Sequence, residues 1–156
     1  MRIRDPDVHF VPNYPKKEMA YAPRMAILQT SARILLGSAM VGAGVLHLVS
    51  RDEFRAQVPS WFPIDEDLTV LVSGVVEIGL GVAFIAFPQK KRLIGGLLAA
   101  FLVAVFPGNI AQYVEGTDAF GLTTDRARFI RLFFQPVLVA WALWAGSWFS
   151  RERSSD

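Results

Sequence analysis

Four apolar runs constrain the fold of this chain more than any other feature. They cover about residues 25–49, 68–87, 93–114 and 129–149. An α-helix rises about 1.5 Å per residue, so about 20 residues are enough to cross the hydrocarbon of a bilayer. Each run reaches this length. The sequence therefore predicts an all-α, polytopic membrane protein, with residues 25–149 forming a four-transmembrane-helix bundle.

The composition excludes several classes of function. The chain has 156 residues, of which 53% are hydrophobic, and it contains no cysteine, so disulfides, thiolate metal sites and thiol–disulfide catalysis within it are excluded. The formal net charge of +2 is small and the basic residues cluster at the ends of the runs, so we expect no nucleic-acid partner. Intramembrane ligands for a haem or a metal ion are too few, so no metal is expected either.

The segments outside the runs are polar or broken by prolines. Residues 1–24 contain four prolines, which predict an irregular cytoplasmic N-terminal arm, and residues 150–156 form a cytoplasmic tail. Residues 50–67 are too short to span, and their aromatic residues predict an interfacial segment between the first two helices. We expect Asp65 to start the second helix, and the Arg33 side chain to extend to the headgroups.

The lysines and arginines predict the orientation in a cell membrane. Eleven of the 16 lysines and arginines lie in the N-terminal arm together with Arg33, in residues 88–92 and at the C-terminus. Cytoplasmic loops carry the excess of these residues in membrane proteins. The expected protein is therefore multi-pass, with both termini cytoplasmic. The other five, which face outward in this arrangement, are Arg51, Arg55, Arg126, Arg128 and Arg131.

Glu77 lies near the middle of the second apolar run. An ionisable group at that depth costs about 2.5–3.5 kcal/mol on insertion scales, so such groups are usually functional and partnered. Counted along the helices, Gln135 and Asn109 lie close to its level, whereas Arg131 and His47 lie nearer the outer surface. This ranking favours a neutral Glu77 hydrogen-bonded to the two amides over an ion pair with Arg131.

Together, these groups predict a polar pocket in the outer half of the bundle, beneath the segment that contains Trp61. Glu77 is a candidate proton donor or acceptor, and His47 is a second catalytic candidate. The candidate ligand-binding residues are Arg131, Gln135, Asn109, Ser73, Trp61 and Phe54. The alternative interpretation is a hydrogen-bond network that only clamps four helices together. Pro107 should also leave the carbonyl of Val103 in need of a partner.

Several short motifs follow one another on the successive predicted helices. They are Gly44-Val45-Leu46-His47, Phe54, Val58-Pro59-Ser60-Trp61-Phe62-Pro63, Ser73-Gly74-Val75-Val76-Glu77, Phe106-Pro107-Gly108-Asn109 and Arg131-Leu132-Phe133-Phe134-Gln135. In this order, over about residues 30–146, the chain resembles the DoxX-like membrane proteins. Alanine is common in that family at the position of Gly108, and proline at that of Phe133, so both are departures.

The resemblance implies a four-helix integral membrane protein linked to membrane redox work. Named members include a small subunit of a thiosulfate:quinone oxidoreductase and partners of thiol-redox and superoxide-detoxifying proteins. We therefore expect a redox accessory that binds a quinone or another small lipophilic molecule. A membrane-associated oxidoreductase is the expected partner, and small-residue helix faces allow an oligomer. A small-solute carrier, an acid–base isomerase acting on a lipid and a structural assembly subunit stay open, as does whether the chain is an enzyme.

Overall fold

The computed structural model describes the backbone of residues 16–149 and the side chains of residues 24–149. This part of the chain is helical, with a single isolated bridge between Ala119 and Leu122. Four of the helices are long and apolar enough to cross a membrane. The expected set of four long helices is confirmed. The elements are α1 (Lys16–Val49), α2 (Arg51–Arg55), α3 (Glu66–Ala86), η1 (Pro88–Lys90), α4 (Lys91–Val114) and α5 (Asp125–Ala145).

The helix boundaries follow local capping. Asp65 caps α3, as expected, by accepting a hydrogen bond from the backbone N–H of Leu68 at 3.0 Å. Thr124 caps α5 in the same way, so α5 begins at Asp125, four residues earlier than its apolar run. Of the expected irregular arm, residues 1–15 lie outside the described residues, as does the tail 150–156.

α1 begins at Lys16, so the prediction of an irregular arm is wrong for residues 16–24. The helix continues through Pro23. A proline inside a helix removes one backbone hydrogen bond and favours a kink or a break, but neighbouring turns can carry the helix past it.

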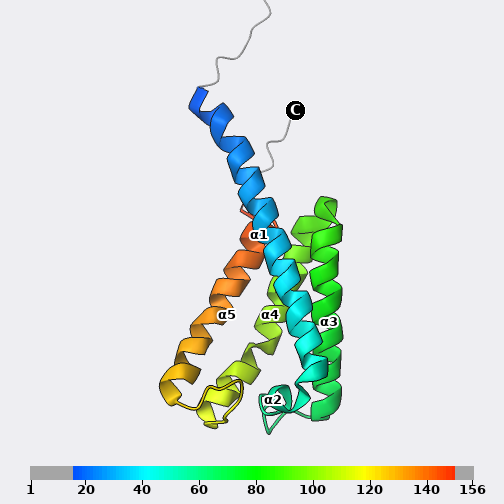
Figure 1. Cartoon of the computed structure of the whole chain (residues 1–156), viewed down its shortest axis with the longest axis vertical. Helices are drawn as coiled ribbons and strands as arrows, with labels where there is room; N and C mark the ends of the chain where they lie inside the picture. The colour runs from blue at the N-terminus through cyan, green and yellow to red at the C-terminus, as the bar shows by residue number, and fades with distance from the viewer. Residues whose placement is uncertain (1–15, 150–156) are drawn as a thin grey trace, which may run out of the picture.

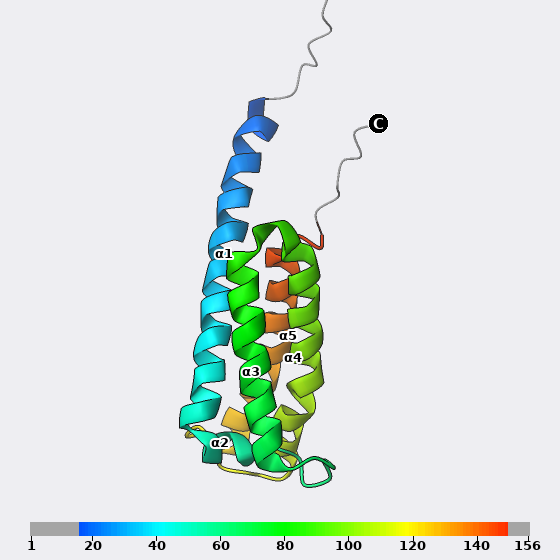
Figure 2. The ribbon, with the colours of Figure 1, turned by 90° about the vertical axis from the view of Figure 1, so that its right-hand side faces the viewer.

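The four long helices form two closely packed pairs that diverge from each other (Figure 1). α1 runs along α3, and α4 runs along α5. The view turned by 90° shows α3 between α1 and α4, with α5 behind (Figure 2). Near η1, α1 and α5 touch: the indole Nε1 of Trp141 donates to the carbonyl of Ala32 at 3.2 Å, and Ser147 Oγ donates to Gln29 Oε1 at 3.3 Å. Toward α2 the two helices separate.

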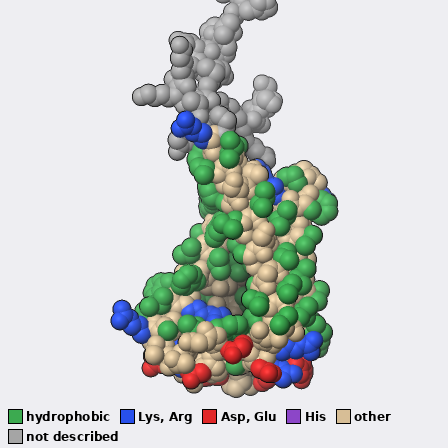
Figure 3. Space-filling view, viewed as in Figure 1, with side chains coloured by type: hydrophobic (Ala, Val, Ile, Leu, Met, Phe, Trp, Pro, Cys, Tyr) green, Lys and Arg blue, Asp and Glu red, His purple; other side chains and the backbone are tan. Residues whose placement is uncertain are grey.

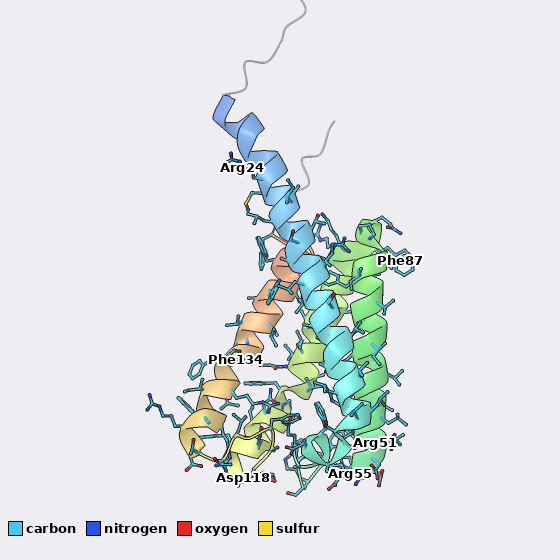
Figure 4. The ribbon with its side chains drawn as sticks, in the orientation of Figure 1. Arg24, Arg51, Arg55, Phe87, Asp118 and Phe134 are labelled. Carbon is cyan, nitrogen blue, oxygen red and sulfur yellow. The ribbon has the colours of Figure 1, made fainter. Side chains whose placement is uncertain are left out.

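We call the two ends of the bundle the η1 end and the α2 end. The η1 end carries the start of α1, η1 and the end of α5, whereas the α2 end carries α2 and residues 115–124. A side-chain view places Phe87 at the η1 end and Arg51, Arg55 and Asp118 at the α2 end (Figure 4). The short α2 and the residues after it therefore lie across one end of the bundle, as expected for residues 50–67.

A packed apolar core fills the η1 half of the bundle. It contains Leu36, Phe84 and Leu98, which are all nearly inaccessible. Arg33 is also buried here, at 6% exposure, so the expectation that it extends to headgroups is wrong. Its guanidinium instead donates to the carbonyls of Phe84 and Ile85 at the end of α3. The last carbonyls of a helix lack intrahelical donors and carry the negative end of its dipole, so they attract a cation.

Glycines allow α1 and α3 to approach at two points. A Cβ on Gly44 would lie 2.6 Å from the carbonyl oxygen of Gly74, and a Cβ on Gly81 would lie 2.6 Å from the carbonyl oxygen of Gly37. Each pair of glycines on one helix is seven residues apart, so two successive contacts fall on the same face. Small residues at such crossings permit close backbone packing.

These contacts predict the effect of single alanine substitutions. Gly44→Ala and Gly74→Ala should each lower the free energy of unfolding by about 1–3 kcal/mol, because the added methyl group collides with the facing helix. Gly42→Ala and Gly79→Ala on the same two helices meet nothing within 4 Å and should be neutral or stabilising by up to about 1 kcal/mol. Denaturant unfolding in detergent, followed by circular dichroism, measures this. Equal effects of all four would contradict the packing.

Candidate functional site

A cavity of about 550 Å³ lies between the diverging helix pairs, toward the α2 end. Figure 3 shows a hollow between α5 and α1 with basic side-chain atoms at its lower edge. Phe134 is on the α5 side of this gap (Figure 4). All eight residues selected from the sequence line this one cavity: His47, Phe54, Trp61, Ser73, Glu77, Asn109, Arg131 and Gln135.

Helical periodicity explains why these residues share the cavity. On α1 the lining residues are Met40, Ala43 and His47, and on α5 they include Arg131, Gln135 and Leu138. Residues three, four or seven apart lie on one face of a helix. Each long helix therefore presents residues of one face to the cavity. On α1 and α5 these residues are apolar toward the η1 end and polar toward the α2 end, whereas on α3 the lining residue nearest the η1 end is Glu77.

His47 and Glu77 form a buried pair across the α1–α3 contact. The imidazole Nδ1 lies 2.9 Å from the carbonyl oxygen of Ala43 and 3.0 Å from Glu77 Oε2. Both neighbours accept hydrogen bonds, so Nδ1 carries a proton and the other ring nitrogen, Nε2, is left for another partner. Glu77 Oε2 receives no well-aligned hydrogen bond within the described residues, despite its short distance to Nδ1. Two groups that can each take part in proton transfer therefore lie within contact distance of each other inside the bundle.

Asn109 and Gln135 form a second pair, across the α4–α5 contact. Gln135 Nε2 donates to the carbonyl of Leu102 at 2.5 Å, and Asn109 Nδ2 donates to Gln135 Oε1 at 3.2 Å. A carbonyl only accepts, so the Leu102 oxygen fixes the orientation of Gln135, which in turn fixes that of Asn109. Asn109 Oδ1 is left as an acceptor without a partner in the described part of the chain.

The carbonyl that receives this bond is that of Leu102, not the Val103 carbonyl expected from the position of Pro107. Leu102 is 4% exposed and faces the bundle, whereas Val103 is 58% exposed and faces away. A carbonyl oxygen has two lone pairs. The Leu102 oxygen can therefore accept from Gln135 in addition to its own helix.

Arg131 is the third polar feature of the cavity. Its Nη2 donates to Gln57 Oε1 at 2.9 Å, and its guanidinium lies over the ring of Phe120 at 5.2 Å. No carboxylate lies within ion-pair distance of Arg131 among residues 24–149. Arg128, one turn earlier, instead bonds Asp118 and Asp125. Arg128 is thus neutralised by its neighbours, whereas Arg131 is not.

Aromatic rings line the α2 end of the cavity. Phe54 stacks on His47 with ring centroids 3.6 Å apart, and its ring meets that of Phe120 edge-on at 4.7 Å. Phe120 has a positive φ of 55°, and its backbone N–H donates to Glu53 at 2.5 Å. Contacts therefore run from Glu77 through His47, Phe54 and Phe120 to Arg131. Trp61 contributes to the cavity wall but is 68% exposed.

The partners of Glu77 differ from those expected. The prediction that it bonds the amides of Asn109 and Gln135 is wrong, since these two residues bond each other and Glu77 contacts His47. An ion pair between Glu77 and Arg131 is also not formed within the described residues. The depth of a residue along its helix gives its level in the bundle but does not show which helices are neighbours. Because α3 packs along α1, His47 lies next to Glu77.

Gln57 and Phe120 were not selected from the sequence. Gln57 lies in the segment interpreted as interfacial, and Phe120 in a loop, so neither belongs to a periodic pattern. The one signal for Gln57 is an uncharged polar residue between Ala56 and Val58. For Phe120 the sequence offers no such signal. No group of three or more metal-ligating side chains occurs among the described residues.

Comparison with known proteins identifies the family but no activity. Residues 36–146 match a family model described as "Domain of unknown function (DUF8561)". This match covers more than half of the chain, so the chain belongs to that family. No curated protein and no solved structure matches it.

Proposed function

We propose that this member of the DUF8561 family is a multi-pass integral membrane protein that binds a small lipophilic molecule with a polar head, such as a quinone, in the cavity between α1 and α5. The observation that carries the proposal is the composition of that cavity. Polar groups gather at its α2 end, and the remaining wall is apolar.

Membrane insertion would give such a ligand a direct path. The four long helices are apolar enough to span, and the hollow faces sideways between two of them (Figure 3). In a bilayer, that opening would face the lipid chains. A lipophilic molecule could then enter without passing through water, and its tail could remain between the helices.

The polar groups supply the contacts that a quinone head needs. Arg131 donates to a carbonyl oxygen of the quinone head, whereas Asn109 Oδ1, the acceptor left by the Asn109–Gln135 pair, suits a hydroxyl of the reduced head. The His47–Glu77 pair exchanges one of the two protons that accompany the two-electron reduction or oxidation of the head, and the partner oxidoreductase supplies or takes up the electrons. The resemblance to DoxX-like proteins supports a redox-associated accessory role. Because the chain has no cysteine, any thiol chemistry would belong to a partner oxidoreductase or its substrate.

The packed core speaks against the carrier alternative. A carrier needs access from both ends of the bundle, whereas Leu36, Phe84 and Leu98 fill the η1 half. A ligand is therefore expected to enter and leave by the same side.

Ligand titration tests the proposal. A decyl-substituted benzoquinone should bind the wild-type protein, and Arg131→Leu should weaken this binding about tenfold or more, since it removes a charged donor in an apolar cavity. Glu77→Gln should weaken it several-fold by removing the carboxyl group beside His47. Quenching of tryptophan fluorescence in detergent measures both. Arg126→Leu is the matched control, because Arg126 is exposed and on the same helix. Unchanged affinity in both cavity variants would contradict the proposal.

Single cysteines test the insertion and the proposed orientation, with both termini cytoplasmic. The chain has no native cysteine, so Thr123→Cys and Gln89→Cys each introduce one exposed thiol, at the α2 end and the η1 end respectively. A membrane-impermeant maleimide should label position 123 in intact cells and position 89 only after lysis, because basic loops stay in the cytoplasm. The reverse pattern would contradict the orientation. Labelling of both positions in intact cells would contradict insertion.

A further inference from the structure

The hydrogen bonds of the cavity leave one buried donor unused. Gln57 Nε2 is buried and has no partner in the described part of the chain. Its orientation follows from chemistry: arginine only donates, so the Gln57 oxygen must face Arg131 and the nitrogen must face elsewhere. A buried donor without a partner destabilises the protein, and a bound acceptor would satisfy it.

The same residue lies beside the unpaired cation. Arg131 has no carboxylate partner among the described side chains, so the Gln57–Arg131 pair presents several N–H groups and a positive charge, and its one remaining acceptor is the second lone pair of Gln57 Oε1. A carbonyl oxygen suits such a pair, because it accepts hydrogen bonds and carries partial negative charge. A hydroxyl group suits it less, since its proton must compete with Arg131 for the Gln57 oxygen.

From these observations, and resting on the proposed function, we infer that Gln57 and Arg131 together bind a carbonyl oxygen of the ligand head. Gln57 is then a specificity-determining residue that favours the oxidised quinone, which has carbonyls, over the reduced quinol, which has hydroxyls. The acceptor left by the Asn109–Gln135 pair, Asn109 Oδ1, lies in the same cavity and suits the opposite form.

Gly108 explains how Gln57 reaches this position. A Cβ on Gly108 would lie 2.9 Å from the backbone carbonyl oxygen of Gln57. The segment after α2 therefore packs directly on the backbone of α4 at this point. Alanine at position 108 would push Gln57 away from Arg131, which gives a second, independent way to disturb the pair.

The test compares the two redox forms of one ligand, decyl-substituted benzoquinone and its quinol, in anaerobic titrations. Gln57→Glu replaces the free donor by an acceptor and neutralises Arg131. It should weaken quinone binding about tenfold or more and leave quinol binding unchanged or tighter. Gln57→Met should weaken quinone binding without tightening quinol binding, because it removes the amide and adds no charge. Gly108→Ala should also lower the preference for quinone.

Gln89→Glu is the control, since it makes the same change at an exposed position of η1. The unfolding midpoint of each variant is compared with that of the wild type, which identifies any variant that fails to fold. If Gln57→Glu fails to fold, the result for Gln57→Met decides the test. Quinone binding by the wild type with an unchanged quinone-to-quinol ratio in the folded variants would overturn this inference alone. Absence of binding of either form to the wild type would overturn the proposed function and this inference with it.

Discussion

The close packing of α1 on α3 is the contact on which the site depends. Gly74 lets α1 approach until a Cβ at that position would lie 2.8 Å from the Cβ of His47. The imidazole lies beside Glu77, and its Nδ1 is 3.0 Å from the carboxyl oxygen Oε2. A larger residue at the crossing would move the histidine away and leave a buried acid without its neighbour.

The second constraint is the separation of α5 from α1 toward α2. A closed bundle would bury the polar stripes of all four helices against each other. Here the helices pair two by two, and the polar residues follow that pairing: His47 with Glu77, and Asn109 with Gln135. Arg131 pairs across the gap with Gln57, a residue outside the long helices. Each pair leaves at least one hydrogen-bonding atom unused, which supports the proposal of a ligand over a network that only clamps helices together.

Much of this architecture follows from sequence, because long apolar runs and helical spacing are local properties. The four long helices, the cap at Asp65 and the shared cavity of the eight selected residues were all predicted in this way. The partners within the cavity were not, since spacing does not show which helices are neighbours. Arg33 illustrates the same limit: its position near a helix end suggested a path to water, but the free carbonyls of α3 lie closer. Gln57 lies in an irregular segment, where no period indicates which way a side chain points.

The central claim is that the cavity between α1 and α5 holds a lipophilic molecule by its polar head. The most direct test is a structure of the protein extracted together with its native lipids. The account predicts non-protein density beside Glu77, with the head within hydrogen-bond distance of Arg131 and Gln57 and the tail leaving between α1 and α5. A structure in which α5 closes against α1, or in which the cavity contains only water, would contradict it.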